Sequence, residues 1–450
     1  MAKSKQKFIC QNCEAVFYKW AGRCESCGEW NSLVEQTLPG AGRSAVARSI
    51  NNGKPLQVNS LNSISFEEGM KRLKTGIGDL DIILGGGILP GGVTLLAGQP
   101  GIGKSTLLLQ TVSNIAHNYD VLYISGEESA GQVRLRAARL GADKSSNLNF
   151  AASTSADDIA ATIRTGKYQL VVVDSVQTLH LNEITSSPGS ISQITNSSNV
   201  IINAAKETGT SVIFVGHVTK EGSIAGPKIL EHLVDVVLQF EGDRYGGFKI
   251  VRAVKNRYGS TNEAAIFEMG EKGLRIVENP SAALLAERRD EDGSVVLATL
   301  EGARPLLVEI QALVNSTNFG YPKRTASGFD INRLNLLIAV LERRTKLKLS
   351  DKDIYINVVG GIKISDPAAD LAICMAIASA SAGRRLNYGT VVFGEVGLGG
   401  EVRSVTSIEK RIAEAKKLGF TKALAPRTSK DDFIIGVDNV RSTLIEYLQK

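Results

Sequence analysis

The segment GQPGIGKST, residues 98–106, contains the residue types that bind a polyphosphate. It matches the pattern GxxxxGK[ST] without a mismatch, and its glycines would let backbone amides close around phosphate groups. Lys104 would bridge the β- and γ-phosphates, and the hydroxyl of Ser105 would ligate Mg²⁺. We therefore predict a site for ATP and Mg²⁺ whose nucleotide contacts are Gly98, Gln99, Pro100, Gly101, Ile102, Gly103, Lys104, Ser105 and Thr106.

Acidic residues at the ends of two other apolar runs would complete such a site. The run in YQLVVVDSVQ ends at Asp174, which is placed to hold Mg²⁺ through water. The run in DVLYISGEES ends in two acids, and Glu127 or Glu128 would orient and deprotonate the attacking water. We favour Glu127 as the base, although the sequence does not separate it from Glu128. These residue types predict hydrolysis of the bound nucleotide.

A third apolar run, in SVIFVGH, ends at His217. A polar side chain at this position can sense the γ-phosphate and relay its state to the loop that follows. The alternative is that His217 only caps a strand.

Four of the five cysteines form two CxxC pairs in CQNCEAVFYKWAGRCESC, residues 10–27. Two such knuckles facing each other make the closed tetrahedral thiolate site that Zn²⁺ prefers, so we predict the zinc ligands Cys10, Cys13, Cys24 and Cys27. A rubredoxin-like iron site and a redox dithiol are the alternatives. A module of about 30 residues has too small a core to fold alone, so the metal would supply much of its folding energy. Such a ribbon can contact nucleic acid or protein, and the sequence does not say which.

These chemical groups need a scaffold that places them together. VTLLA is a short apolar run suited to a buried strand, and TLLLQTVSNIA continues after the glycine-rich loop as an apolar-faced helix. The acids and the histidine follow further short apolar runs of the kind found in parallel sheets. Because the carboxyl ends of parallel strands meet at one edge, we predict an α/β fold that gathers these side chains there.

Length and composition are those of a multidomain globular protein. The chain has 450 residues, 43% of them hydrophobic, and no apolar stretch long enough to span a membrane. We therefore expect a cytoplasmic protein with no membrane partner. The net charge of +6 permits a polyanionic partner without requiring one. We place a zinc ribbon at 1–35, a linker at 36–60, an ATPase domain at 61–280 and a further domain at 281–450.

The order of motifs resembles the RadA (Sms) family of bacterial DNA-repair ATPases in the RecA superfamily. TGIGDLDIILGGGILPGG, the glycine-rich loop, VVVDS, GHVTKEG and KNRYG occur in the family's order behind a matching cysteine ribbon, and the likeness covers essentially the whole chain. The resemblance implies a RecA-like ATPase core and a homo-hexameric ring resembling the DnaB helicases. It also implies binding of single-stranded and branched DNA, co-operation with the recombinase RecA, and ATP-driven branch migration in homologous recombination.

KNRYG fits a ring that hydrolyses nucleotide between subunits. Lys255 and Arg257 are two residues apart, so on an extended segment they would point the same way. They are candidates to enter a neighbour's site and stabilise the charge on the transferring phosphoryl group. A solvated basic strand end and phosphate contacts to DNA are the alternatives. Tyr258 stands where the family has Phe, and it keeps the aromatic ring.

From about residue 281 the chain resembles the α+β proteolytic domain of Lon proteases. A Lon-type dyad needs a serine nucleophile and a lysine that takes its proton. The matching positions here are Ala368 and Glu409, while Ser365 and Lys410 are displaced from the motif. We therefore predict a proteolytically inactive scaffold that closes the ring. An ATP-dependent protease and a KaiC-like signalling ATPase remain the alternative functions.

Basic residues in two regions are candidates for tracking a DNA backbone. The loop after His217 contains Lys220 and Lys228, and its position lets nucleotide state move it. The later domain carries the clusters LERRTKLKL and AGRRL, for which a solvated face is the alternative. Their candidate residues are Arg343, Arg344, Lys346, Lys348, Arg384 and Arg385.

Overall fold

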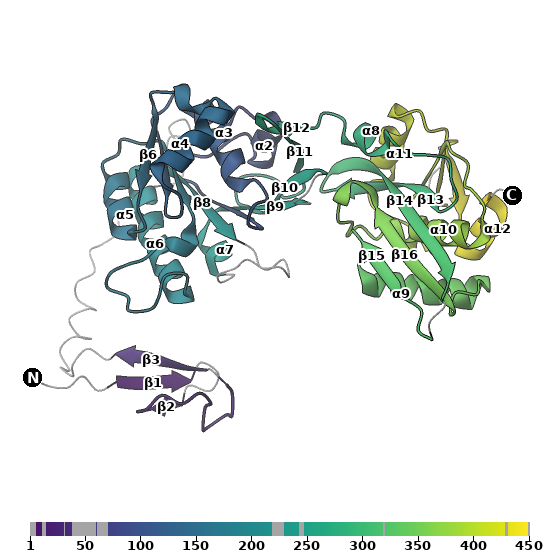
Figure 1. Ribbon diagram of the computed structural model, residues 1–450, viewed down its shortest axis with the longest axis horizontal. Helices are drawn as coiled ribbons and strands as arrows, with labels where there is room; N and C mark the ends of the chain where they lie inside the picture. The colour runs from purple at the N-terminus through teal and green to yellow at the C-terminus, as the bar shows by residue number, and fades with distance from the viewer. Residues whose placement is uncertain are drawn as a thin grey trace, which may run out of the picture. The chain divides into compact units, whose positions relative to one another are not determined.

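The computed structural model divides the chain into two compact units, Met1–Phe66 and Glu67–Lys450 (Figure 1). It describes residues 6–10, 15–30, 32–37, 60, 71–217, 229–242, 247–317, 320–427 and 431–448. Within these ranges no helix combines the length and the apolar character that crossing a membrane would require.

The first unit is a small antiparallel sheet. Its strands are β1 (Gln6–Cys10), β2 (Val16–Phe17) and β3 (Leu33–Thr37), and β1 lies in the middle. Cys10 and Cys24 are buried with Leu33 in a very small core. The described part of this unit encloses few apolar side chains, as expected for a module of about 30 residues.

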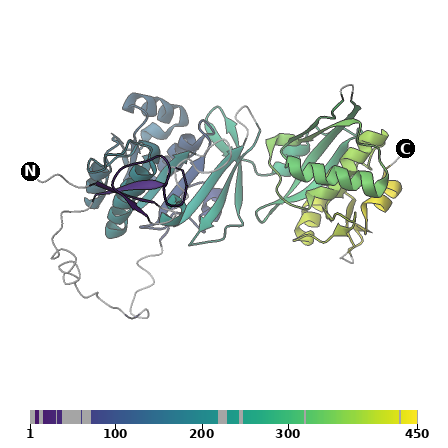
Figure 2. The ribbon, with the colours of Figure 1, turned by 90° about the horizontal axis from the view of Figure 1, so that it is seen from below.

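The second unit contains a nine-stranded mixed sheet in the order β12-β11-β10-β9-β4-β8-β7-β5-β6. Its parallel strands are β4 (Val93–Gly98), β5 (Val121–Ser125), β6 (Leu148–Ala152), β7 (Leu170–Asp174), β8 (Ser211–His217) and β9 (Val236–Gly242). The antiparallel extension, teal to green in Figure 2, consists of β10 (Lys249–Asn256), β11 (Ala264–Gly270) and β12 (Gly273–Ile276). The predicted α/β core is therefore confirmed.

Helices cover both faces of this sheet because successive strand residues point to opposite sides. Val172 of β7 belongs to one buried cluster, together with residues of α2 (Gly78–Ile83), α3 (Lys104–Ile115) and α4 (Ala130–Leu140). The neighbouring Val171 belongs to another, together with residues of α5 (Ala156–Arg164), α6 (Ile191–Thr208) and α7 (Ile229–Leu233). Two apolar layers thus hold the central strands, which explains their uninterrupted runs of apolar residues.

A seven-stranded sheet forms the C-terminal part of the same unit, in the order β15-β16-β14-β13-β17-β20-β21. The strands are β13 (Ser294–Glu301), β14 (Arg304–Ser316), β15 (Arg324–Ser327), β16 (Lys352–Val358), β17 (Thr390–Val392), β20 (Lys422–Pro426) and β21 (Ile434–Val437). A separate pair comprises β18 (Glu395–Val396) and β19 (Val402–Arg403). The accompanying helices are α8 (Pro280–Leu285), α9 (Ile331–Val340), α10 (Ala369–Ala382), α11 (Ile408–Lys417) and α12 (Val440–Tyr447).

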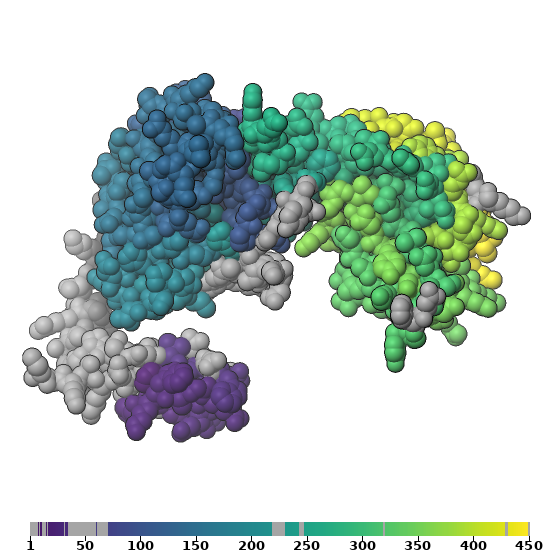
Figure 3. All heavy atoms as spheres, viewed as in Figure 1, coloured from purple at the N-terminus to yellow at the C-terminus, as the bar shows by residue number. Residues whose placement is uncertain are grey.

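The two sheets of this unit share apolar contacts. Ile250 of β10 and Ile266 of β11 belong to the same buried cluster as residues of the C-terminal sheet. In the space-filling view the teal surface adjoins the green surface of the C-terminal region (Figure 3). An ion pair joins Arg252 to Glu301 at 3.0 Å, and another joins Arg304 to Asp79 at 2.9 Å.

Candidate functional site

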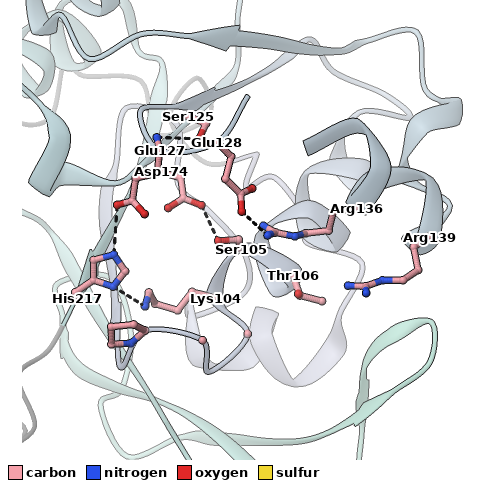
Figure 4. A pocket seen from close by; sticks show the side chains of 13 residues that line it. Lys104, Ser105, Thr106, Ser125, Glu127, Glu128, Arg136, Arg139, Asp174 and His217 are labelled. Atoms are coloured by element: carbon pink, nitrogen blue, oxygen red, sulfur yellow. Dashed lines mark hydrogen bonds and ion pairs between the residues drawn. The ribbon is translucent and has the colours of Figure 1, made fainter. Parts of the chain in front are cut away.

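Four adjacent parallel strands deliver the predicted site residues to one edge. In the order β4-β8-β7-β5, the strands end at Gly98, His217, Asp174 and Ser125. A cavity of about 390 Å³ opens there, and side chains from the predicted site line it (Figure 4). They are Lys104, Ser105, Thr106, Glu127, Glu128, Asp174 and His217. The parallel arrangement therefore brings together residues up to 113 positions apart in the chain.

The glycine-rich loop has the backbone that phosphate binding requires. Gly101 and Gly103 have φ angles of 78° and 118°, which side-chain-bearing residues rarely adopt. Gly103 is also the residue before α3, so the positive end of that helix dipole faces the cavity. A Cβ on Gly98 would approach the carbonyl oxygen of Phe240 to 2.6 Å, so only glycine fits there. The loop and cavity fit a nucleotide polyphosphate.

Lys104 is buried at the floor of this cavity. Its Nζ donates to the carbonyl oxygens of Gly98 and Gln99 at 2.8 and 3.0 Å and lies 3.2 Å from Nδ1 of His217. Burial lowers the pKa of Lys104 to about 8, and the negative charges of Asp174 and Glu127 offset only part of that effect. An incoming phosphate would replace the carbonyl groups with a full negative charge.

Oxygen atoms suited to Mg²⁺ meet at Asp174. Its Oδ2 accepts hydrogen bonds from the hydroxyls of Ser105 at 2.7 Å and Tyr123 at 2.6 Å. Hard oxygen donors of this kind are the ligands that Mg²⁺ prefers, so the donor set fits the predicted metal. Sequence reasoning missed Tyr123, which is buried in β5 and has a pKa well above its usual value because of burial and the charge of Asp174.

The two candidate bases have different partners. Oε1 of Glu127 accepts a hydrogen bond from Ser175 Oγ at 2.5 Å and lies 3.5 Å from Nε2 of His217. Glu128 instead forms an ion pair with Arg136 at 2.5 Å. His217 therefore stands between Lys104 and Glu127 (Figure 4), whereas Glu128 is held by a cation from α4. This arrangement favours Glu127 as the residue next to the reacting phosphate.

Two arginines of α4 line the same cavity and were not predicted. Arg136 and Arg139 are three residues apart, a spacing that puts both on one face of a helix. The signal was present in RLRAAR, residues 134–139, but it depends on knowing which way α4 faces. They add two cations to the opening of the cavity.

Lys255 and Arg257 do not line this cavity, but both contact one short segment. Lys255 Nζ donates to the carbonyl oxygens of Glu231 and Val234 at 2.6 and 2.7 Å. Arg257 Nη1 donates to Asp235 Oδ1 at 3.1 Å while its side chain stays 55% exposed. Both side chains therefore contact residues 231–235, and their role in a neighbouring site stays a prediction.

Three cysteine sulfurs converge in the first unit. The Sγ atoms of Cys10, Cys24 and Cys27 all lie within 4.8 Å of one another among the described residues. Gly28 follows with a φ of 77°, and its amide donates to the carbonyl of Cys24 at 2.8 Å, which closes a tight knuckle. Convergent thiols of this kind fit zinc. The predicted fourth ligand, Cys13, lies outside the described residues.

The basic DNA candidates are only partly described. Lys220 and Lys228 lie outside the described residues. The other candidates are exposed and fall into two groups, one in the π-helix Leu341–Thr345 and the segment after it, and one in the segment after α10; they are Arg343, Arg344, Lys346, Lys348, Arg384 and Arg385. Arg385 forms an ion pair with Asp290 at 3.0 Å, so part of its charge is neutralised.

The two positions that match a Lon-type dyad hold no catalytic pair. Ala368 is fully buried just before α10, and Glu409 is exposed in the first turn of α11. The displaced Lys410 donates from Nζ to the carbonyl of Ala303 at 3.2 Å. Next to it in the sequence, the fully buried Arg411 contacts the partly buried Asp366 at 2.7 Å. Burial alone would raise the pKa of Asp366, but hydrogen bonds and the charge of Arg411 outweigh it and leave the pKa below its usual value.

Family comparisons agree with each part of this architecture. The model for an AAA domain matches residues 69–223, and the model for a rubredoxin metal binding domain matches residues 8–35. The model for subunit ChlI of Mg-chelatase matches residues 334–429. The fold and site therefore define a RecA-like P-loop ATPase that carries a zinc ribbon and a ChlI-like C-terminal region.

Curated relatives identify the particular family. The chain is 48% identical to "DNA repair protein RadA" of Bacillus subtilis over 457 aligned residues, covering 99% of both chains. It is 46% identical to the Pseudomonas aeruginosa protein of that name, covering 95% of this chain and 94% of the relative, and 44% identical to the Aquifex aeolicus one, covering 100% and 99%. The chain belongs to the DNA repair protein RadA family and is a DNA repair ATPase of the RecA-like class.

Proposed function

We propose that this ATPase is a DNA motor that promotes branch migration of recombination intermediates. The observation that carries the proposal is the meeting of Lys104, Asp174 and Glu127 in one cavity, in a chain similar to RadA proteins over nearly its whole length. A cavity that combines a phosphate-binding lysine, a metal-binding carboxylate and a carboxylate that can act as general base supports nucleotide hydrolysis. The family's role in DNA repair supports DNA as the partner.

The residues divide the work of hydrolysis. Lys104 and the amides at the start of α3 would bind the phosphates, and Ser105 directly and Asp174 through water would hold Mg²⁺. When bound, Mg²⁺ neutralises charge on the phosphoryl oxygens. Glu127 accepts a proton from the attacking water, and His217 links it to Lys104, so loss of the γ-phosphate is relayed to the segment after β8.

A ring assembly would complete the site. Lys255 and Arg257 lie outside their own chain's cavity, and Arg257 keeps an exposed guanidinium. In a homo-hexamer they would enter the adjoining subunit's site and stabilise the transition state. We also propose that the chain divides into a ribbon (1–35), a linker (36–60), an ATPase domain (61–280) and a C-terminal domain (281–450). The C-terminal domain would be a proteolytically inactive scaffold of the ring.

DNA contacts and partners form the outer part of the proposal. Lys220 and Lys228, with the exposed basic candidates of the C-terminal region, would track the backbone of single-stranded DNA in the channel. The motor would act on branched DNA intermediates, and a RecA recombinase would form them. Ala368 and Glu409, which stand at the serine and lysine positions of the Lon-type dyad, argue against proteolysis.

Steady-state ATP hydrolysis with and without single-stranded DNA, over a salt series, tests the proposal. Stimulation that fades as salt rises is expected, because phosphate contacts release counterions. A three-strand branch-migration assay with the Lys104→Ala protein as control then tests the motor itself. An ATP hydrolysis rate that DNA does not change at any salt concentration would refute the DNA-motor proposal and favour a signalling ATPase. Degradation of casein would favour a protease.

A further inference from the structure

Both tryptophans of the chain lie on the zinc ribbon, and both are exposed. Trp20 is 62% exposed and Trp30 is 68% exposed, and Tyr18, two residues before Trp20, is 67% exposed. Large aromatic side chains are normally buried for most of their surface, and an exposed group of them marks an interaction site. We call these three residues the aromatic platform.

The two indoles both lie close to a residue that has no side chain. A Cβ on Gly22 would lie 3.9 Å from the ring of Trp20 and 4.0 Å from the ring of Trp30, which is ordinary van der Waals contact. Both rings therefore lie near the same point of the ribbon surface.

A guanidinium group extends the platform. The Cζ of Arg23 lies 5.7 Å from the ring centre of Trp30, and its Nε donates to the carbonyl of Gly28 at 2.7 Å. Arg23 and Trp30 also face each other in a backbone bridge. The knuckle that follows Cys24 thus fixes both side chains, so formation of the metal site and formation of the platform are coupled.

Charge on the described ribbon surface is nearly balanced. Lys19 and Arg23 are exposed, but so are Glu25 and Glu29. Two cations suffice for one or two phosphates and do not make an extended electrostatic groove. Among the described ribbon residues, Val34 is the one exposed large aliphatic side chain, so the surface lacks the continuous apolar patch that a protein partner would bury.

Aromatic faces with a neighbouring guanidinium and few charges suit unpaired bases, because every base can stack on a ring. We propose that the aromatic platform, Tyr18, Trp20 and Trp30 with Arg23, binds single-stranded DNA by stacking its bases. The inference rests on the proposed function, in that the ligand is the DNA on which the motor acts. It makes DNA the partner of the ribbon, whereas the sequence did not distinguish between a DNA partner and a protein partner.

Intrinsic tryptophan fluorescence of the full chain reports on this surface alone, because both tryptophans belong to the platform. Titration with oligothymidylate is expected to quench the emission to a saturating value. An abasic oligonucleotide of equal length carries the same phosphates without bases, so it should quench little. Unchanged fluorescence while labelled oligothymidylate binds, or equal quenching by the abasic strand, would overturn the proposal. Quenching by purified recombinase without DNA would assign the platform to a protein partner instead.

Substitutions separate the platform from the motor. Trp20→Ala and Trp30→Ala are each expected to weaken binding of oligothymidylate by about 5-fold or more, as loss of one stacked base does. The matched control is Tyr321→Ala, which removes an 88% exposed aromatic residue from the C-terminal region and should change nothing. Zinc content of each protein confirms that the ribbon remains folded.

The two proposals fail in distinguishable ways. If the Trp20→Ala protein binds oligothymidylate as tightly as the unaltered chain and keeps DNA-stimulated hydrolysis, the platform inference is wrong and the DNA motor stands. If the unaltered chain neither binds oligothymidylate nor hydrolyses ATP faster in its presence, the proposed function is wrong and the platform inference falls with it.

Discussion

Raising the pH is expected to weaken nucleotide binding through Lys104. This side chain is buried beneath the glycine-rich loop, and its pKa is lowered from 10.5 to about 8, chiefly by burial. ATP and ADP are polyanions, so they bind the ammonium form and stabilise it. Above pH 8 the nucleotide-free protein has largely lost that proton, and binding must restore it.

The size of the effect follows from the pKa near 8. About one tenth of Lys104 is protonated at pH 9 in the free protein, and about nine tenths at pH 7. The dissociation constant should therefore rise about tenfold between these values, which corresponds to about 1.4 kcal/mol. Unfolded Lys104 keeps its proton to higher pH, so its contribution to the free energy of unfolding rises as the pH increases from 8 to 10.5. Bound nucleotide keeps Lys104 protonated in the folded protein, so with nucleotide present this contribution to the free energy of unfolding no longer rises with pH.

Isothermal titration calorimetry with ADP and Mg²⁺ measures the effect. The heat of binding at pH 9 is compared in buffers that differ in ionisation enthalpy, and the slope gives the protons taken up. We expect about 0.9 proton per site at pH 9 and about 0.1 at pH 7.

Lys104→Arg provides the matched control. Its guanidinium stays charged across this pH range, so the proton uptake should disappear whatever the absolute affinity becomes. Uptake near zero at pH 9 in the unaltered protein would refute the reasoning, because Lys104 would then be protonated without nucleotide. The same uptake in the Lys104→Arg protein would assign the proton to another group.

Three further outcomes are expected. Tyr123→Phe removes one of two hydroxyls bound to Asp174. In a Mg²⁺ titration, the concentration needed for half-maximal hydrolysis should rise about tenfold with little loss of maximal rate. A changed rate at saturating Mg²⁺ with an unchanged Mg²⁺ dependence would contradict this. Asp366→Ala leaves the buried Arg411 unpaired and should lower the free energy of unfolding by about 3–5 kcal/mol in a urea titration; a loss under 1 kcal/mol would disprove the pairing. Cys27→Ser should abolish zinc binding but preserve ATP hydrolysis without DNA, and loss of both would mean that the ribbon does not fold separately from the ATPase.

Local patterns in the sequence identified most of the nucleotide site. The glycine-rich loop needs only adjacent residues with the right backbone freedom, so GxxxxGK[ST] between a strand and a helix was sufficient to predict it. Apolar runs that end in Asp174, Glu127 and His217 implied a shared edge, because parallel strands align their carboxyl ends. The structure confirms that these side chains surround one cavity.

Residues that act through distant contacts escaped prediction. Tyr123 looked like one more apolar strand residue, and its contact with Asp174 exists only because β5 and β7 are paired. To predict that Arg136 and Arg139 line the cavity, one must know which way α4 faces. The ion pair of Glu128 with Arg136 distinguishes Glu128 from Glu127, and it too appears only in the folded chain. Each of these contacts depends on how elements pack.

The sequence by itself determined the class of chemistry, because the phosphate loop and the cysteine knuckles are built from consecutive residues whose conformations are set locally. Tertiary structure alone decided which acid stands beside His217, which hydroxyls bind Asp174, and that Arg411 pairs with Asp366. The exposure of Trp20 and Trp30 was decided there too. Burial and pairing depend on side chains brought together from far along the chain, and no local spacing specifies them.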